Sequence, residues 1–276
     1  EPGTESDWEH PPFAGVVADG KIYGRGTLDD KSGVIGLLEA AEQLLAEGYQ
    51  PRRTIVFAFG HDEEISGPNG ATAIAQRMKD LGMHFEWMVD EGGFIVDDHP
   101  MVEGKAVALI NVAEKTYLTL TLSATGEGGH SSTPPAISTI GKLSAALSRI
   151  EQTPFPTRLV EPVKAMLEAV APHAGQPNKF VFSNLWLTGP IVKSQMAKDR
   201  MANPYVRTTT ALTLFNAGVK ENVVPQRAEA TINFRLLPGD TPEYVLQTIR
   251  EIVDDESIVI SSKTWKEAPP VADYSG

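Results

Sequence analysis

The sequence predicts two domains, an α/β domain with a mostly parallel sheet followed by an α+β domain of the ferredoxin-like kind. Residues 31–89 alternate helical periods with short, continuous apolar runs, which is typical of strands buried on both faces of a parallel sheet. From about residue 114 apolar and polar residues alternate instead, as in strands with one exposed face. The expected domains are therefore 1–113 and 114–264, and 265–276 should start a return to the first domain.

In the first domain, apolar residues recur at helical spacing over residues 31–48, where Gly48 is a stop signal. Residues 54–60 (TIVFAFG) form an apolar run of strand length. A second helix is expected over 68–82, and residues 85–89 are again strand-like. Strand and helix alternate, which favours parallel strands joined by helices.

In the second domain, the predicted elements follow the order β-α-β-β-α-β, which is typical of a ferredoxin-like fold. The strands are expected at 117–123, 208–215, 228–236 and 257–262, and the helices at about 137–151 and 242–254. Residues 153–206 contain many prolines and no clear period. They are expected to form an insertion with one helix near 160–171.

Composition excludes several classes of function. The chain has 276 residues, a net charge of −12 and a pI near 5.0. A nucleic-acid-binding protein usually has a basic face, and the sequence contains no cluster of Lys and Arg that would form one. No apolar run approaches the roughly 18 residues of a membrane span. The chain has no cysteine, so any metal must be held by His, Asp or Glu. The first seven residues are acidic and polar and show no signal peptide. Composition does not determine a compartment, and the cytoplasm is the working expectation.

Acidic residues gather at three places where strands end or a helix begins. They are Asp29-Asp30 before the first helix, Asp62-Glu63-Glu64 after the first strand, and Asp90-Glu91 after the second. The carboxyl ends of parallel strands face one crevice, and carboxylates brought together there repel one another unless cations neutralise them. Oxygen ligands with one or two histidines suit Zn²⁺, Mn²⁺ or Co²⁺. Helix capping would explain each cluster singly, so the prediction of a metal site depends on all three together.

Three motifs carry a resemblance to a known family. GRGTLDDKSG (24–33), HDEEISG (61–67) and VDEGG (89–93) resemble, in this order, the metal motifs of the di-zinc family of aminoacylase, acetylornithine deacetylase, succinyl-diaminopimelate desuccinylase and carboxypeptidase S. The resemblance covers nearly the whole chain and is closest to the carboxypeptidase S branch, which includes N-acyl-amino-acid hydrolases. It implies that the α/β part is a zinc-hydrolase domain and that the α+β part is a lid or dimerisation domain.

The resemblance implies two zinc ions per site, with Mn²⁺ or Co²⁺ as alternatives. Asp29 would bridge the ions, while Glu64 would bind one of them and Asp90 the other. Glu63 would be the general base, which takes a proton from the attacking water and passes it to the leaving nitrogen. The alternative for Glu63 is a further metal ligand. Asp62 would orient its neighbours, and the peptide bond that follows the bridging aspartate is usually cis in this family.

The resemblance also implies two histidine ligands that this sequence does not contain. The family's first zinc histidine belongs just before the position of Glu1, and its last belongs beyond Gly276. His10 precedes two prolines in a loop and is not expected to replace either. Each zinc ion should therefore lack its histidine, so this chain is expected to bind metal weakly or partially and to have little or no activity.

Three residues of the second domain would complete the site. His130, in GEGGHSSTPP, resembles the family's lid histidine and would stabilise the oxyanion of the tetrahedral intermediate. The alternative is a loop histidine with a structural hydrogen bond. Arg235, in FRLLP, would hold a substrate carboxylate in a bidentate pair, and Asn222, in NVVP, would bind substrate or support the oxyanion. In the family's dimers the lid histidine often reaches the partner's site, whereas the insertion could mimic a second lid in a monomer.

The predicted function is hydrolysis of the amide bond of a peptide C-terminus or an N-acyl amino acid by metal-activated water. One rival is a non-catalytic relative that keeps the fold as a binding or dimerisation module. Such a protein could lose Glu63 without cost to folding, and Glu63 is present. A phosphatase-like two-metal enzyme is the other rival, and it is not expected to carry the motifs around His130 and Arg235. The expected partner is the small substrate, with no nucleic acid and no membrane segment, and a homodimer through the lid domain stands as one alternative beside a monomer.

Overall fold

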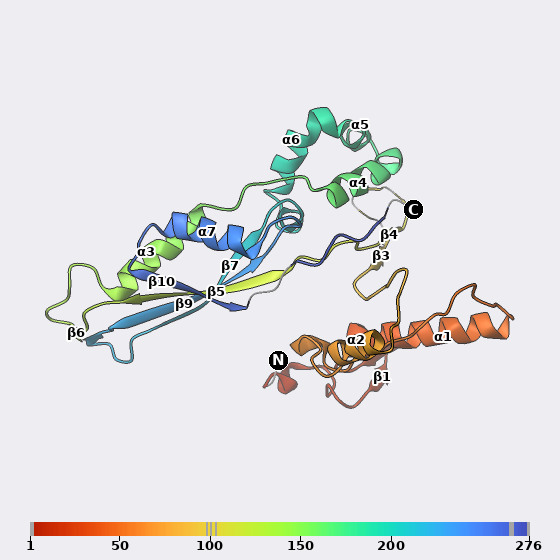
Figure 1. Ribbon diagram of the computed structural model, residues 1–276, viewed down its shortest axis with the longest axis horizontal. Coiled ribbons are helices and arrows are strands. Elements are labelled where there is room, and N and C mark those ends of the chain that lie inside the picture. The colour runs from red at the N-terminus through yellow and green to blue at the C-terminus, as the bar shows by residue number, and fades with distance from the viewer. Residues whose placement is uncertain (1–2, 98, 100, 103, 265–267, 275–276) are drawn as a thin grey trace. The chain divides into compact units, whose positions relative to one another are not determined.

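The computed structural model describes residues 3–97, 99, 101–102, 104–264 and 268–274. The chain divides into two compact units at Gly92–Gly93 (Figure 1). The hairpin of β3 (Phe94–Val96) and β4 (Val107–Leu109) clusters with the second unit, so the division precedes the change of pattern that the sequence shows near residue 113. Within the described residues, none of the helices has the length and apolar character that crossing a bilayer requires.

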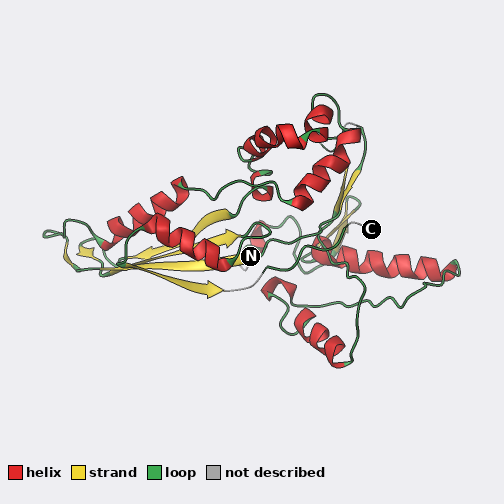
Figure 2. Cartoon of the chain, turned by 45° about the horizontal axis from the view of Figure 1, so that its top comes forward, coloured by secondary structure: helices red, strands yellow, loops and turns green. Residues whose placement is uncertain are grey.

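The first unit contains a small hairpin and two helices. β1 (Val16–Ala18) pairs antiparallel with β2 (Lys21–Tyr23). α1 (Ser32–Ala46) and α2 (Ala71–Asp80) lie within the predicted helical segments, so both predictions are confirmed. Gly48 has a φ of 77°, a left-handed conformation that only glycine adopts readily. It lies two residues after the last residue of α1, where the sequence predicts that the helix stops. Figure 2 shows the long connection between the two helices as loop, apart from one short helical turn.

The parallel sheet predicted for this unit is wrong for the described residues. Neither 54–60 nor 85–89 forms a strand, and every ladder in the described part of the chain is antiparallel. An apolar run favours burial, but a strand also needs a neighbour to complete its hydrogen bonds. Arg53 and Glu86 form an exposed ion pair at 2.9 Å, which joins the beginnings of the two segments. All the buried hydrophobic side chains that the structure describes lie beyond this unit.

The second unit is built on a four-stranded antiparallel sheet with the spatial order β10-β5-β9-β7. Two helices, α3 and α7, pack on it and on each other (Figure 1). The strands are β5 (Tyr117–Thr125), β7 (Thr209–Ala217), β9 (Arg227–Arg235) and β10 (Ile258–Thr264), and the helices are α3 (Thr139–Gln152) and α7 (Pro242–Val253). The predicted order β-α-β-β-α-β is therefore confirmed, element by element.

The core of this unit lies between the sheet and the two helices. Alternate residues of the central strands are fully buried and meet apolar residues of α3 and α7, because side chains along a strand point to opposite faces. The largest are Leu118, Leu120 and Leu122 of β5, Ile232 and Phe234 of β9, Leu143 and Ile150 of α3, and Ile249 of α7. Burying each such side chain contributes roughly 1.5–3 kcal/mol. Side chains of Ser138 and Thr241 cap the two helices by accepting backbone hydrogen bonds.

The insertion at 153–206 is a helical body with its own core, and the sequence predicts only one of its helices. α4 (Glu161–Val170) confirms the helix expected near 160–171. α5 (Asn178–Ser183) is too short to show a period, and α6 (Leu185–Met196) contains Pro190 and is apolar on exposed and buried sides alike. The small core contains Val163, Leu167, Ala171, Ala174, Phe182 and Val192.

Short elements complete the chain. β6 (Gly129–His130) pairs with β8 (Val223–Val224), and short helical turns occur at Glu5–Asp7, Thr27–Lys31, Glu63–Ile65, Ala171–His173 and Asn203–Tyr205. The Ala272 amide donates to the Val112 carbonyl at 2.7 Å, so the chain's last described segment runs beside the approach to β5. Of the predicted return segment, residues 265–267 and 275–276 lie outside the described residues.

Candidate active site

Asp29 lies in the turn Thr27–Lys31, immediately before α1. The Asp29–Asp30 peptide bond is cis, as predicted. The Asp30 carboxylate accepts a hydrogen bond from the Gly33 amide at 3.0 Å, and a Cβ at Gly33 would collide with that carboxylate. Asp30 therefore stabilises the first turn of α1 by accepting a backbone hydrogen bond. Of the two carboxylates in this motif, Asp29 is the one that remains a candidate for binding a ligand.

The second motif forms a short turn at Glu63–Ile65, preceded by Asp62. The Asp62 carboxylate accepts hydrogen bonds from the amides of Asn69 at 2.9 Å and Gly70 at 2.8 Å. These bonds, that from Asn69 above all, lower the pKa of Asp62 below its usual value. Asp62 is thereby committed to holding the loop that leads into α2, which supports an orienting role beside Glu63.

Carboxylates of all three motifs share one region of the first unit. The pKa of Glu91 is raised, first by desolvation and then by the negative charges of Asp29, Asp30, Glu63 and Asp90. Such repulsion weakens with distance, so Asp29 lies within electrostatic range of Glu91, which follows it by 62 positions. Asp29, Glu63 and Asp90, three of the four predicted site residues of this unit, thus all act on the charge of Glu91.

The donor chemistry of this region fits a divalent cation, while its geometry is not that of a formed metal centre. Clustered carboxylate oxygens suit Zn²⁺, Mn²⁺ or Co²⁺, and a cation would relieve their mutual repulsion. Across the part of the chain that the structure describes, no three acidic or histidine side chains are arranged to hold one ion. Asp90 Oδ1 instead accepts a hydrogen bond from the Glu91 amide at 2.9 Å. The ligand roles of Asp29, Glu64 and Asp90 therefore stay predictions.

His130 and Asn222 are brought side by side in the second unit by the β6–β8 ladder. His130 pairs with Val223, and the Ser131 amide donates to the Asn222 carbonyl at 3.1 Å. The Asn222 Oδ1 is buried and has no hydrogen-bond partner in the described structure. A buried acceptor without a donor costs roughly 1–3 kcal/mol. The role of Asn222 in binding substrate stays a prediction.

Arg235 lies at the far end of the sheet from His130. It ends β9, where it pairs with Tyr117, and its guanidinium lies 5.2 Å from the centre of the Tyr117 ring. β5 starts at Tyr117 and is nine residues long, and His130 follows the opposite end of that strand. At a rise of about 3.3 Å per residue, the strand alone separates the two ends by roughly 26 Å. The second unit therefore does not bring these two predicted site residues together.

A polar cluster near Arg235 was not predicted from the sequence. The half-buried Lys115 donates to the carbonyls of Pro204 and Arg207, each at 2.9 Å, and desolvation lowers its pKa to about 8. Its neighbour Asp240 is buried and bonds Arg158 at 2.7 Å. These contacts attach both ends of the insertion to the sheet. A lysine just before an apolar strand was the only signal in the sequence.

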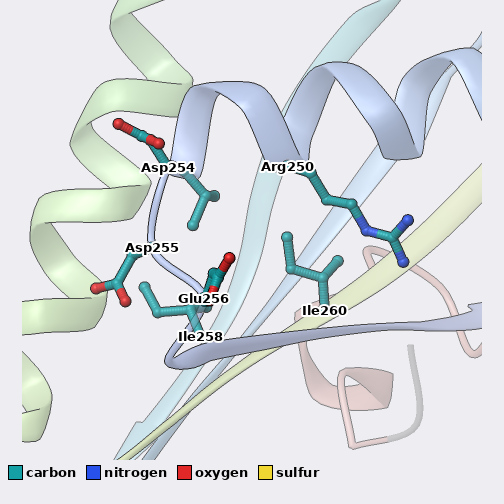
Figure 3. A pocket seen from close by; sticks show the side chains of 7 residues that line it. Arg250, Asp254, Asp255, Glu256, Ile258 and Ile260 are labelled. Atoms are coloured by element: carbon teal, nitrogen blue, oxygen red, sulfur yellow. The ribbon is translucent and has the colours of Figure 1, made fainter.

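A hollow of about 460 Å³ lies at the C-terminal end of α7, beside β10 (Figure 3). It is lined by Arg250, Val253, Asp254, Asp255, Glu256, Ile258 and Ile260. The Asp255 carboxylate accepts hydrogen bonds from both the amide and the hydroxyl of Ser257. None of the predicted site residues lines this hollow, so it is separate from the candidate active site.

Known proteins similar to this chain agree with the motifs. The family model described as Peptidase family M20/M25/M40 matches residues 2–268. The N-fatty-acyl-amino acid synthase/hydrolase PM20D1 of Bos taurus is 46% identical over 258 residues, which cover 93% of this chain and 51% of that protein. Probable carboxypeptidase S-like 2 of Dictyostelium discoideum is 42% identical over 258 residues, 92% of this chain and 49% of that protein. The chain thus spans about half the length of these curated relatives.

A solved structure agrees at the level of the fold. The M20 family metallo-carboxypeptidase Sso-CP2 from Sulfolobus solfataricus superposes with a TM-score of 0.60 at 16% sequence identity, over 97% of this chain and 62% of that one. The match extends over both units, although the sequences have diverged widely. The family match over residues 2–268 and the identity to these relatives show that the chain belongs to peptidase family M20/M25/M40.

Proposed function

We propose that the full-length protein is a metal-dependent hydrolase that cleaves the amide bond of an N-acyl amino acid, with peptide C-termini as the second substrate class. The observation that carries this proposal is that the three carboxylate motifs supply Asp29, Glu63 and Asp90 within electrostatic range of Glu91. The mutual repulsion of such carboxylates favours a bound cation, and Glu63 can act on a water molecule. The similarity to PM20D1, an N-fatty-acyl-amino acid synthase/hydrolase, supports the substrate class.

In this proposal Asp29, Glu64 and Asp90 would hold the two zinc ions of the site. Bound zinc would make water a stronger acid and polarise the substrate carbonyl. Glu63 takes the proton of the attacking water and delivers it to the leaving nitrogen, a transfer that needs a carboxylate within hydrogen-bond reach. Asp62 keeps the turn of Glu63 in place through its two bonds to the loop.

Residues of the second unit recognise the substrate. Arg235 is an exposed cation on a rigid strand and binds the free carboxylate of the amino acid as a fork. His130 donates a hydrogen bond to the carbonyl oxygen as it becomes negative. The buried, unpaired Oδ1 of Asn222 accepts a hydrogen bond from the substrate. The second unit thus acts as a lid, either of a homodimer or of a monomer in which the insertion takes the place of the second lid.

The test is a direct assay of the full-length protein expressed with zinc. N-acyl amino acids of short and long acyl chain and peptides with the same C-terminal residue are compared, and Glu63→Gln serves as the matched control. We expect hydrolysis that a chelator abolishes and added zinc restores, while the 276-residue chain alone has little or no activity. A folded, zinc-loaded full-length protein that hydrolyses neither class would refute the proposal.

A further inference from the structure

The imidazole of His130 is held by its own turn. Its Nδ1 lies 3.2 Å from the backbone nitrogen of Ser132, which donates to it, and 2.8 Å from the Ser132 hydroxyl oxygen. The same turn is closed by a hydrogen bond from the Thr133 amide to the His130 carbonyl at 3.1 Å. One serine therefore contacts one ring nitrogen through two different groups, and the other ring nitrogen, Nε2, takes no part in these contacts.

The direction of these hydrogen bonds determines where the proton of the neutral ring resides. A backbone N–H can only donate, so the Nδ1 that receives it has no proton of its own. With Nδ1 unprotonated the hydroxyl can only donate to it, and the amide and the hydroxyl share the single lone pair of that nitrogen. Neutral His130 therefore carries its proton on Nε2. We propose that Ser132 is a positioning residue that fixes the tautomer and the orientation of His130, so that Nε2–H is presented as a donor.

The surrounding backbone makes this arrangement stable. The β6–β8 ladder holds the main chain of His130 against Val223, and the Gly126 amide donates to the Gln226 carbonyl at 2.9 Å. A Cβ on Gly128 would lie 2.9 Å from the Val224 carbonyl oxygen, so the close approach of the two segments requires glycine there. With the backbone held by the ladder, the ring's remaining freedom is rotation about its side-chain bonds. The bonds to Ser132 restrict that rotation.

This inference rests on the proposed function, because an oxyanion is stabilised by an N–H and only Nε2 can supply one here. Ser132 itself contacts no reacting atom. Loss of its hydroxyl should therefore lower the share of molecules with a correctly presented Nε2–H and reduce kcat, while substrate affinity in the ground state changes little. A residue that merely stabilised the loop would not change which ring nitrogen is protonated.

The first measurement reads the tautomer and needs no catalysis. The 276-residue chain, labelled with ¹⁵N in its six histidines, is examined by long-range ¹H–¹⁵N correlation, with His130→Gln to assign the signal. In the wild type we expect an unprotonated Nδ1 and a protonated Nε2 for neutral His130. Ser132→Asp replaces the donating hydroxyl with an acceptor and should shift the proton of the neutral ring toward Nδ1, against the backbone amide that remains. A neutral wild-type ring protonated on Nδ1 would overturn the inference.

The second measurement is kinetic and uses the full-length enzyme. Ser132→Ala should lower kcat by roughly 3- to 10-fold, on the scale of one lost neutral hydrogen bond, with KM nearly unchanged. Ser132→Thr keeps the hydroxyl and should restore most of kcat, and Ser131→Ala is the matched control for the neighbouring serine. Wild-type kcat in Ser132→Ala would overturn the positioning role. If the wild type hydrolyses no amide while the tautomer is as expected, the proposed function fails and the hold of Ser132 on the ring stands.

Discussion

His130 and Arg235 lie at opposite ends of one four-stranded sheet. Arg235 pairs with Tyr117 at the start of β5, and His130 follows the end of that strand, so roughly 26 Å of strand lies between the two ends. In an N-acyl amino acid, the amide carbonyl and the free carboxylate are only a few bonds apart. One copy of this unit therefore cannot apply both residues to the same substrate molecule. Either a second lid or the insertion must supply one of the two contacts.

The first prediction separates these arrangements by mixing two inactive full-length proteins. Glu63→Gln lacks the base and His130→Ala lacks the oxyanion donor, and each should lose roughly 10²-fold or more in kcat. If His130 acts across a dimer, mixed dimers contain one intact site and activity returns. Recovery is measured as activity against mixing ratio, with each variant mixed with itself as the control. No recovery in a protein shown to exchange subunits would place His130 in the site of its own chain.

Glu63→Gln tests the general base by itself. The amide keeps the size of the carboxylate but cannot take a proton from water. We expect zinc content near that of the wild type and a fall in kcat of roughly 10²-fold or more. Zinc content is measured by elemental analysis beside the kinetics. Loss of zinc together with activity would make Glu63 a ligand, and retained activity would remove it from the mechanism.

Arg235 should discriminate substrates by their free carboxylate. Arg235→Lys keeps the charge but loses the fork, so kcat/KM for an N-acyl amino acid should fall by roughly 10- to 100-fold, on the scale of hydrogen bonds to charged groups. The same substrate with its carboxylate amidated lacks the partner of the fork. On that amidated substrate, the kcat/KM of Arg235→Lys should therefore be close to the kcat/KM of the wild type. An equal loss on both substrates would show that Arg235 acts through its stacking on Tyr117 and not through the carboxylate.

Asp62 should make the loop before α2 sensitive to acid. Its pKa is lowered in the folded chain, so its stabilising effect is present above the ordinary value of 3.8 and is lost as the pH falls below that value through the folded pKa. Amide hydrogen exchange at Asn69 and Gly70, whose N–H groups bond Asp62, should accelerate over that range beyond its intrinsic pH dependence. Asp62→Asn should show fast exchange there already at neutral pH. Unchanged protection in the variant would contradict the role of the carboxylate.

Lys115 should make the second unit more stable at high pH. Its pKa is about 8 in the folded chain and 10.5 ordinarily, so between these values the unfolded chain binds more protons and stability rises with pH. Lys115→Met has no such group. The free energy of unfolding of the wild type relative to this variant should therefore increase from about pH 8 to 10.5, as measured by denaturant titration. Lys220→Met, at an exposed lysine, controls for the loss of one charge. If the difference in the free energy of unfolding between the wild type and Lys115→Met did not change with pH, Lys115 would not be desolvated.

Periodicity was sufficient to predict the helices and strands that carry their own amphipathic pattern. α1, α2, α3 and α7 and the four strands of the second unit follow from the spacing of their apolar residues. α6 was missed because an element that is apolar all round has no period to read. The segment TIVFAFG was predicted as a strand because its composition favours burial, yet no neighbouring strand pairs with it in the described structure.

The sequence by itself determined which carboxylate motifs this chain carries and therefore which chemistry to predict, because the three motifs are local and their order is readable. Only the tertiary structure set Asp29, Glu63 and Asp90 within electrostatic range of Glu91, since that range depends on how distant segments fold together. It alone set His130 and Arg235 at opposite ends of a sheet, a consequence of strand register that no local pattern contains. It also put Ser132 against Nδ1 of His130, because a hydrogen-bond direction is a property of three-dimensional geometry.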